Sequence, residues 1–432
     1  MSGRRRRKTT LGTGVAILLT LVVLVSSGFV LLRLGSGHRA DLSRLNMQVI
    51  SLKTDQAPGE QPGKQQAEPT QQTQRSENRE TQTQSAVPAP ETFREKQALL
   101  TFGGTIAIEE NIRKSGYLAD SKKYDFSDIF MLLSPELQGR TAGAFLENLI
   151  MENARVSATV IPPAGAEMMK ASGFSVAFSG FSKAWDKAES GITETIGMLE
   201  SNGIRALGIC RSASGERILL QDIDGIRIAM MQYTDTLSSG ARKAMQKKDL
   251  TGMIPEADPE LIASDIAAAR AGGADAVLVF LNWGKTGGKT PDKAQTILAQ
   301  QIADSGADLI IGAGSRVPQK VEYLLTPDGR QVLCAYSLGT LISDNRKSAN
   351  RMGGFLLHVQ LNRTGEHEVQ IGRATYTPTY VWKYRQDGKD YYRVVASDRA
   401  APDGMANDQI KQMQKTLSVV QEALQGAPVE IR

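Results

Sequence analysis

The residues from about Asp55 to Pro90 include no Leu, Ile, Met or aromatic side chain, and this segment separates two very different parts of the chain. Gln, Glu, Thr, Ser and Pro dominate it. Such a composition cannot bury enough apolar surface to offset the entropy that the backbone loses on ordering. We therefore expect residues 55–97 to form a disordered tether, and we expect the folded domain to begin at about residue 98.

The segment before the tether is predicted to anchor the chain in a membrane. Five consecutive cations, Arg4 to Lys8, precede an apolar run over residues 11–34 whose only charged residue is Arg33. About 20 apolar residues suffice to cross a bilayer as a helix. Because cations favour the cytoplasmic side, residues 1–10 are expected in the cytoplasm and the rest of the chain outside the cell. A cleaved signal peptide is the alternative, but the run is long for one and no clear cleavage site follows.

The next residues, 35–54, are predicted to form a short juxtamembrane helix. Leu42, Leu45, Val49 and Leu52 follow a 3-4-3 spacing, which makes two heptads of a coiled-coil seam. Two heptads are fewer than a convincing coiled coil needs, so they give only a hint of a homodimer. A short helix at the membrane interface accounts for the pattern equally well.

The charge of the chain argues against nucleic-acid binding, and its two cysteines raise the question of a disulfide. The formal net charge is +5, and the five cations near the N-terminus supply all of it, so the remaining chain is nearly neutral and nucleic-acid binding is not expected. The two cysteines, Cys210 and Cys334, lie in apolar, strand-like surroundings. An extracytoplasmic location permits a disulfide, but we expect two separate buried free thiols.

From residue 98 onward, apolar strand patterns alternate with helical patterns. Strands are expected at 98–102, 174–179, 205–209, 276–281 and 309–311, and helices at 126–133, 192–200, 259–272 and 293–305. Hairpins are expected at 217–233, 321–338 and 355–376, the first two around Asp-Gly pairs. This mixture favours a layered α/β fold with one mixed sheet or two. Residues 396–432 are predicted to hold an amphipathic helix that packs on the domain, since Ile410, Met413, Leu417, Val420 and Leu424 share one helical face.

Several short motifs in this region occur in a characteristic order. They are Asn282-Trp283-Gly284, the run 306–312 followed by Gly314-Ser315-Arg316-Val317, and the run 336–342. Together they resemble the CapA family of capsule and poly-γ-glutamate synthesis proteins over about residues 99–342, with the strands up to about residue 395 included. The resemblance implies an α/β sandwich like that of the calcineurin-type metallophosphoesterases, with two mixed β-sheets flanked by helices, over residues 98–395.

The same resemblance implies that the metal-binding residues are missing. The family has an Asp where Gly104 stands, and histidines where Lys183, Asn282, Gly314 and Arg316 stand, whereas Asp186 is retained. A two-metal hydrolase needs carboxylate and imidazole ligands that hold two ions about 4 Å apart. None of the three histidines of the chain lies near these positions in sequence. We therefore expect no metal, no cofactor and no catalytic residue, and we interpret paired carboxylates such as Glu147 and Glu152 as solvated surface.

A cleft without metal ions can still bind anions through its own cations. We predict an anion-binding cleft at the positions of the missing ligands, because ammonium and guanidinium groups bind carboxylates and phosphates. Its predicted residues are Lys183, Arg316, Asp186, Asn282, Trp283 and Lys285. The alternative is that these side chains face water, or that the cations pair with Asp186.

By the resemblance, the chain is expected to take part in the synthesis, export or retention of a capsule, poly-γ-glutamate or another anionic polymer at the cell surface, by binding or scaffolding. Its expected partners are the membrane, the anionic polymer and membrane proteins of polymer synthesis. One alternative is a working metal-dependent hydrolase with unusual ligands such as Asp186, Asp222 or Asp235. Another is a purely structural envelope protein that reuses the fold.

Overall fold

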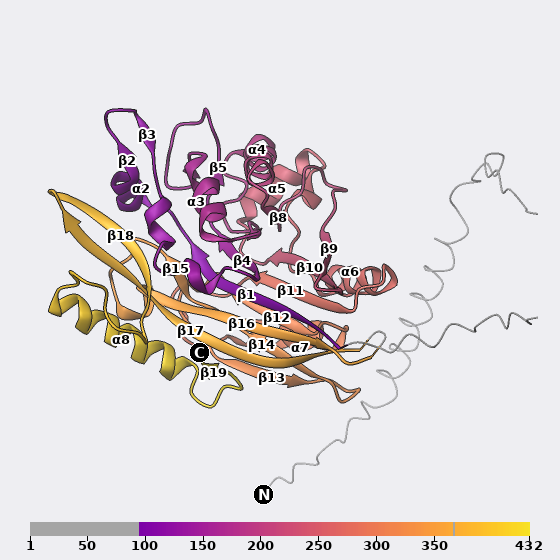
Figure 1. Ribbon diagram of the computed structural model, residues 1–432. Helices are drawn as coiled ribbons and strands as arrows, with labels where there is room; N and C mark the ends of the chain where they lie inside the picture. Colours follow the sequence, from indigo (N-terminus) through magenta and orange to yellow (C-terminus); the bar gives the residue numbers. More distant parts are fainter. Residues whose placement is uncertain (1–94, 366–367) are drawn as a thin grey trace, which may run out of the picture. The chain divides into compact units, whose positions relative to one another are not determined.

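A computed structural model describes residues 95–365 and 368–432 of the chain (Figure 1). The predicted cytoplasmic segment, membrane helix and juxtamembrane helix, and nearly all of the predicted tether, lie outside the described residues. Within the described ranges, no helix combines the length and the apolar character that a membrane span requires.

Two mixed β-sheets form the body of the domain (Figure 1). The larger has nine strands, in the order β18 (Lys389–Ala396), β17 (Val369–Gln386), β16 (Gly353–Arg363), β1 (Lys96–Ile106), β4 (Thr141–Leu146), β7 (Val176–Phe178) and β8 (Arg205–Leu207), with β15 (Thr340–Ile342) beside β1 and β19 (Glu430–Ile431) beside β17. The smaller has six, in the order β13 (Val321–Leu325), β14 (Gln331–Ala335), β12 (Leu309–Ala313), β11 (Ala276–Asn282), β10 (Ile226–Thr234) and β9 (Ile218–Ile223). Each sheet contains parallel and antiparallel pairs, so the predicted pair of mixed sheets is confirmed.

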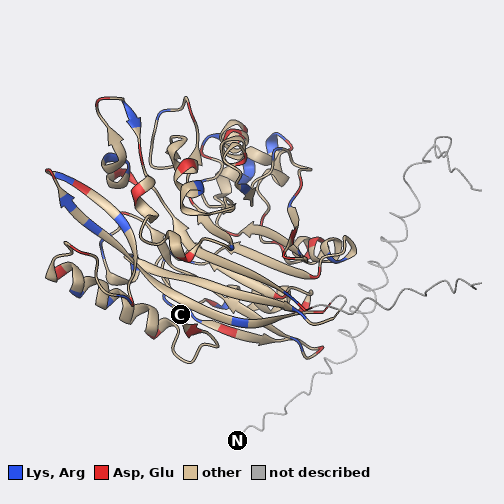
Figure 2. Ribbon diagram, in the orientation of Figure 1, with Lys and Arg blue, Asp and Glu red and all other residues tan. Residues whose placement is uncertain are grey.

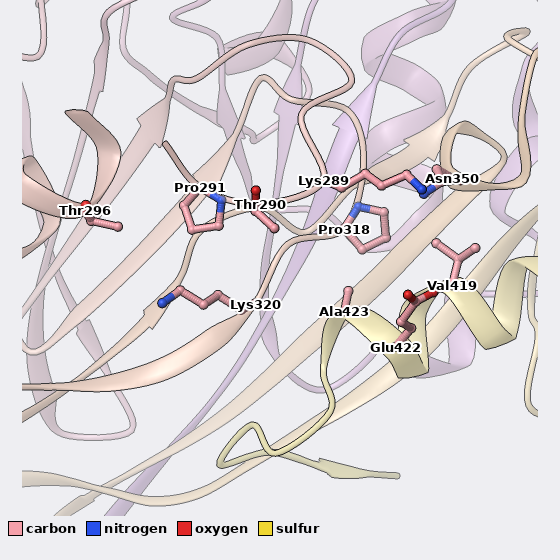
Figure 3. Close-up of a pocket in the computed structure, with 10 residues that line it drawn as sticks. All are labelled: Lys289, Thr290, Pro291, Thr296, Pro318, Lys320, Asn350, Val419, Glu422 and Ala423. Carbon is pink, nitrogen blue, oxygen red and sulfur yellow. The ribbon is translucent and has the colours of Figure 1, made fainter. Parts of the chain in front are cut away.

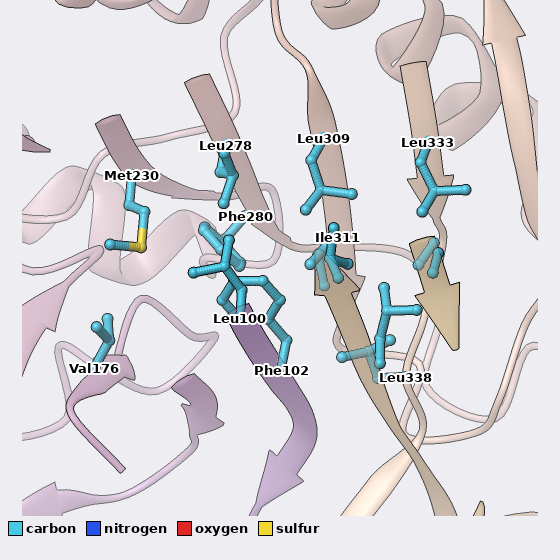
Figure 4. Packing of buried hydrophobic residues seen from close by; sticks show 14 of the residues in the cluster. Leu100, Phe102, Val176, Met230, Leu278, Phe280, Leu309, Ile311, Leu333 and Leu338 are labelled. Atoms are coloured by element: carbon cyan, nitrogen blue, oxygen red, sulfur yellow. The ribbon is translucent and has the colours of Figure 1, made fainter. Parts of the chain in front are cut away.

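The two sheets pack face to face around one apolar core (Figure 4). Leu100 and Phe102 of β1 lie against Leu278 and Phe280 of β11, and all four side chains are fully buried. The ring of Phe280 also stacks on a phenylalanine of β7 in the opposite sheet, with a centroid distance of 3.8 Å. In Figure 2, charged residues are nearly absent from the middle of both sheets. Alternate residues of these strands point into the core because side chains alternate between the two faces of a strand.

Helices cover the outer faces of the sandwich. On the smaller sheet lie α6 (Pro259–Ala271) and α7 (Lys293–Asp304), and on the larger lie α3 (Ala164–Ser172), the 3₁₀ helix η1 (Ser127–Phe130) and part of α4 (Ala188–Ser201). The remaining short elements are α2 (Glu110–Gly116), α5 (Ser239–Lys247), η2 (Ser134–Glu136), η3 (Thr251–Met253), η4 (Ala349–Arg351) and the strand pairs β2 (Tyr117–Leu118) with β3 (Lys123–Tyr124) and β5 (Leu149–Ile150) with β6 (Val160–Ile161). The parallel strands of both sheets are therefore buried on both faces, which explains their almost continuous apolar sequences.

Most local predictions from the sequence are confirmed. The first hairpin turns at Asp224 and Gly225, whose φ angles of 52° and 80° are those of the tight turn that Asp-Gly favours. The predicted helix at 126–133 is wrong, because only the 3₁₀ helix η1 and turns form there. Phe126, Ile129, Phe130 and Leu133 are buried, whereas Met131 and Leu132 are exposed. The segment thus has one buried face, as an amphipathic helix would, but it forms only a short 3₁₀ helix, which rarely extends beyond three or four residues.

The C-terminal helix α8 (Asn407–Ala423) packs on the domain, as the sequence predicts. Met413 contacts an aromatic cluster that includes Tyr380 and Trp382, while Val420 reaches the main core. Strand β19 then adds to the edge of β17. The two cysteines are buried and unpaired, as expected.

Candidate functional site

The loops that carry the family-like motifs meet at the carboxyl ends of β1, β4, β11 and β12. Each loop begins where its strand ends. Glu147 directly follows β4, Asn282 is the last residue of β11, and Arg316 lies three residues after β12. Ligands of open α/β sheets bind outside the carboxyl ends of the strands, so this edge is where a functional site is expected.

Arg316 forms a salt bridge with two carboxylates at this edge. Its Nε donates to Oε2 of Glu147 at 2.8 Å, and its Nη1 donates to Oε1 of Glu109 at 2.9 Å. Its Nη2 also contacts Glu147. The Glu147 side chain is 8% exposed, and those of Arg316 and Glu109 are 24% and 28% exposed. The guanidinium therefore holds the two carboxylates together in a largely water-excluded place. We refer to Glu109, Glu147 and Arg316 as the arginine bridge.

Neighbouring polar groups hold the arginine bridge in position. The second oxygen of Glu109 accepts hydrogen bonds from Ser343 Oγ at 2.7 Å and from the backbone N–H of Asp344 at 3.1 Å. The second oxygen of Glu147 accepts a hydrogen bond from Nδ2 of Asn282 at 3.1 Å. Both carboxylates thus receive donors on both oxygens, as buried charged groups require.

The contacts of the bridge shift the pKa values of Glu109 and Arg316 in opposite directions. Burial by itself would raise the pKa of Glu109, but the hydrogen bond from Ser343 and the charge of Arg316 outweigh it and lower that pKa. Burial likewise opposes the charge of Arg316, yet the adjacent Glu147 and Glu109 raise its pKa. The contacts of the bridge therefore favour the charged forms of Glu109 and Arg316.

The buried amide of Asn282 connects the bridge to β10. Its Oδ1 accepts a hydrogen bond from Thr236 Oγ1 at 3.0 Å, and Thr236 Oγ1 in turn lies 2.9 Å from Thr234 Oγ1. Asn282 is 3% exposed. It therefore acts as a fixed spacer between one carboxylate and a pair of hydroxyl groups.

Two glycines at this edge leave no room for side chains. A Cβ atom on Gly104 would lie 2.2 Å from the backbone oxygen of Gly339. Gly314 has a φ of 103°, and a Cβ atom there would lie 2.6 Å from the backbone oxygen of Trp283. Arg316 itself has a φ of 56°, which few non-glycine residues adopt. The backbone around the arginine bridge is therefore closely packed and leaves no room for a side chain at position 104 or 314.

The residues present do not fit the binuclear metal centre that the family resemblance implies. A metal ion would need carboxylate and imidazole ligands around a common point, but the guanidinium of Arg316 lies between the two carboxylates nearest to that point. The glycine at position 104 cannot be replaced by a ligand without moving the backbone. Among the described residues, no group of three or more His, Cys, Asp and Glu side chains is arranged to hold a metal ion.

The structure brings together only part of the predicted anion cleft. Arg316 and Asn282 share the bridge through Glu147. Trp283 is fully buried instead, where its ring stacks on Tyr336 and its Nε1 donates to the Tyr336 carbonyl at 2.9 Å. Lys183, Asp186 and Lys285 are exposed, and no hydrogen bond or ion pair of the described chain joins them to the bridge.

The carboxylates of the alternative hydrolase hypothesis lie far apart. Asp222 accepts a hydrogen bond from the backbone of Gly225 in the turn before β10, whereas Asp235 directly follows β10. The nine residues of β10 separate them, which corresponds to roughly 30 Å at about 3.3 Å per residue. These two residues therefore cannot share a metal ion.

Comparisons with known proteins identify the family of the chain. Residues 99–345 match the family model described as bacterial capsule synthesis protein PGA_cap. The chain belongs to this family. It is 30% identical over 218 residues to the PGA biosynthesis protein CapA of Bacillus subtilis (strain 168), covering 49% of this chain and 55% of that protein. It is 24% identical over 270 residues to the capsule biosynthesis protein CapA of Bacillus anthracis, covering 59% of this chain and 62% of that protein.

The matches thus span little more than half of these relatives' own lengths. Among solved structures, the chain is similar to the calcineurin-like phosphoesterase YfkN of Bacillus subtilis, with a TM-score of 0.39 and 14% identity, over 76% of this chain and all of that chain.

Sequence reasoning missed the two carboxylates of the arginine bridge. The interpretation of Glu147 as solvated surface is wrong, because Glu147 is buried, although Glu152 is exposed as expected. One signal was available: Glu147 directly follows an apolar strand and precedes the family-like Asn148. Glu109 lies three residues after the end of β1, and nothing in its sequence neighbourhood indicates a distant arginine as its partner.

Proposed function

We propose that the chain is a membrane-anchored, extracellular protein that takes part in the synthesis, export or retention of a capsule or poly-γ-glutamate polymer. Membership of the capsule synthesis family and the names of the two CapA relatives support the polymer. The five cations before the apolar run at 11–34 support the anchor and its orientation. Membrane proteins of polymer synthesis are the partners that such a role requires.

We further propose that the chain binds or scaffolds and does not hydrolyse. The arginine bridge carries this proposal. Arg316 contributes a permanent positive charge where a hydrolase of this type would need a divalent cation, and Glu109 and Glu147 already pair with that charge. A guanidinium can neutralise carboxylates, but it cannot lower the pKa of a bound water as a metal ion does.

The arginine bridge also determines which cations near this edge are free to contact an anionic polymer. Arg316 directs its donors at Glu109 and Glu147, so it contributes little free charge. Lys183 and Lys285 are exposed and remain available near this edge. The proposed polymer contact therefore rests on lysines around the bridge rather than on the bridge itself.

Two measurements test the proposed function. In the producing cell, deletion of the gene should reduce the amount of surface polymer, and the full-length chain should restore it, whereas a chain that lacks residues 1–34 should not. In vitro, the full-length protein should not turn over a generic phosphodiester with manganese. Turnover that disappears with a chelator contradicts the non-hydrolytic role, and unchanged surface polymer after deletion contradicts the role in its synthesis.

A further inference from the structure

A pocket lies between the loop that follows β11 and the last turns of α8 (Figure 3). Its volume is about 480 Å³, within the range of roughly 300–1,000 Å³ that is typical of ligand sites. The lining residues are Lys289, Thr290, Pro291, Thr296, Pro318, Lys320, Asn350, Val419, Glu422 and Ala423.

The pocket combines the family domain with residues beyond it. Lys289, Pro291, Pro318 and Lys320 fall within the family match at 99–345, whereas Asn350 and the wall from α8 fall outside it. Figure 3 shows Val419, Glu422 and Ala423 together on α8 at one side of the pocket. Both the family domain and the C-terminal helix α8 are therefore needed to form the pocket.

The loop that forms the other wall has the sequence Lys-Thr-Gly-Gly-Lys-Thr, at residues 285–290. The loop is fixed at its two glycines: the N–H of Gly287 donates to the Ser315 carbonyl at 2.7 Å, and the carbonyl of Gly288 accepts from Gln319 Nε2 at 2.9 Å. A Cβ atom on Gly287 would lie 2.2 Å from the guanidinium of Arg351. This close approach adds a further cation beside the loop.

The lining of the pocket combines two lysines with apolar side chains. Lys289 is exposed, and none of the ion pairs found among the described residues involves it. Lys320 is 45% exposed, and its Nζ lies 2.7 Å from Glu322 and 5.3 Å from the centre of the Tyr336 ring. Pro291, Pro318, Val419 and Ala423 supply the apolar contacts. Glu422 is the one acidic residue of the lining.

We propose that this pocket binds a short segment of an acidic chain whose carboxylates are separated by methylene groups. One carboxylate would pair with Lys289 and another with Lys320, while the methylene groups lie on Pro291 and Pro318. Ammonium groups bind carboxylates as point charges, and the apolar surface favours a ligand with hydrocarbon between its charges. The assignment rests on the proposed role with an anionic polymer, and it places the contact one loop away from the arginine bridge.

The test measures binding of a fluorescein-labelled, γ-linked glutamate hexamer to the full-length protein by fluorescence anisotropy at low salt. The double variant K289Q/K320Q should weaken binding about tenfold, since each exposed charge pair contributes up to about a factor of five. E422Q should strengthen binding, because it removes the repulsive charge. A423W should weaken binding with no change in charge, because the indole fills the pocket. The matched control is K243Q/K247Q, which removes two exposed lysines of α5 and should leave binding within about twofold.

Binding that is equal in the wild type, K289Q/K320Q and A423W overturns the pocket assignment, and so does a wild-type protein that binds no hexamer. Neither result changes the surface-polymer measurement, so failure of the pocket and failure of the proposed function are distinguishable. An α-linked hexamer that binds as tightly as the γ-linked one shows that the pocket responds to negative charge alone, which contradicts recognition of carboxylates separated by methylene groups.

Discussion

Replacing Arg316 with Met should expose how strongly the arginine bridge depends on its central cation. The variant keeps an apolar stem but leaves Glu147, 8% exposed, without its ionic partner. Breaking a buried ion pair by removing one partner costs about 3–5 kcal/mol. The variant can limit this cost by protonating one carboxyl, which at pH 7 requires roughly 3.5 kcal/mol for a group with an ordinary pKa. We therefore expect a loss of about 3 kcal/mol at pH 7.

The pH dependence separates this explanation from a simple loss of packing. Protonating one such carboxyl at pH 5 requires only about 1 kcal/mol, so the loss should shrink to about that value. The wild type points the same way, because the lowered pKa of Glu109 contributes stability that is present above its unfolded pKa and is lost as the pH falls through the folded one. The difference between variant and wild type is thus largest at neutral pH.

Urea unfolding of both proteins at pH 7 and pH 5 measures these values. The double variant E147Q/R316M should recover part of the loss and remove most of its pH dependence. R205M, which removes an exposed arginine of β8, is the control and should change the stability by no more than about 0.5 kcal/mol. A loss below about 1 kcal/mol at pH 7, or the same loss at both pH values, refutes the reasoning.

Three further outcomes are expected. Gly104→Ala should destabilise the protein by about 3 kcal/mol in urea unfolding, because the new Cβ atom would lie 2.2 Å from a backbone oxygen. The control Gly197→Ala, whose Cβ atom would have nothing within 4 Å, should be neutral or stabilising. Equal effects of the two substitutions contradict this explanation. Burial, and to a smaller extent nearby arginines, lower the pKa of His358 to about 3. The stability that the neutral imidazole contributes above about pH 6.5 should therefore decline as the pH falls toward 3. In His358→Gln the dependence of the unfolding free energy on pH should be weaker, and an unchanged pH dependence contradicts this role of His358. The thiols of Cys210 and Cys334 are buried, which raises the pKa of both, so iodoacetamide should label them only after denaturation, as mass spectrometry would show.

The sequence predicts the layers of this fold well because the elements carry strong local signals. Ala276–Asn282 is a continuous apolar run, which identifies a strand buried on both faces, and the Asp-Gly pairs locate two hairpins. The order of the strands has no such local signal. The pairing of β1 with β16 joins residues about 260 positions apart, and only the family resemblance anticipates a sandwich of two sheets.

The candidate site is less predictable, because its chemistry depends on partners that lie far apart in sequence. The family-like motifs predict that Arg316 and Asn282 lie at this edge. They do not predict the contacts with Glu147 and Glu109, which change the chemical role of both residues. An arginine in isolation predicts free positive charge, whereas an arginine between two carboxylates is neutralised. Trp283 shows the same limit, since its motif predicts a cleft residue and the structure packs it under Tyr336.

The two glycines at the edge of the sandwich make the present state of the site hard to reverse. Installing a carboxylate at position 104 places its first carbon 2.2 Å from a backbone oxygen, so the substitution costs stability before any ligand can act. Position 314 has the same obstacle together with a backbone angle that disfavours side chains. Introducing a histidine at position 316 removes the cation that pairs with Glu109 and Glu147. Each single substitution toward metal binding is therefore expected to cost stability before a complete set of ligands is in place.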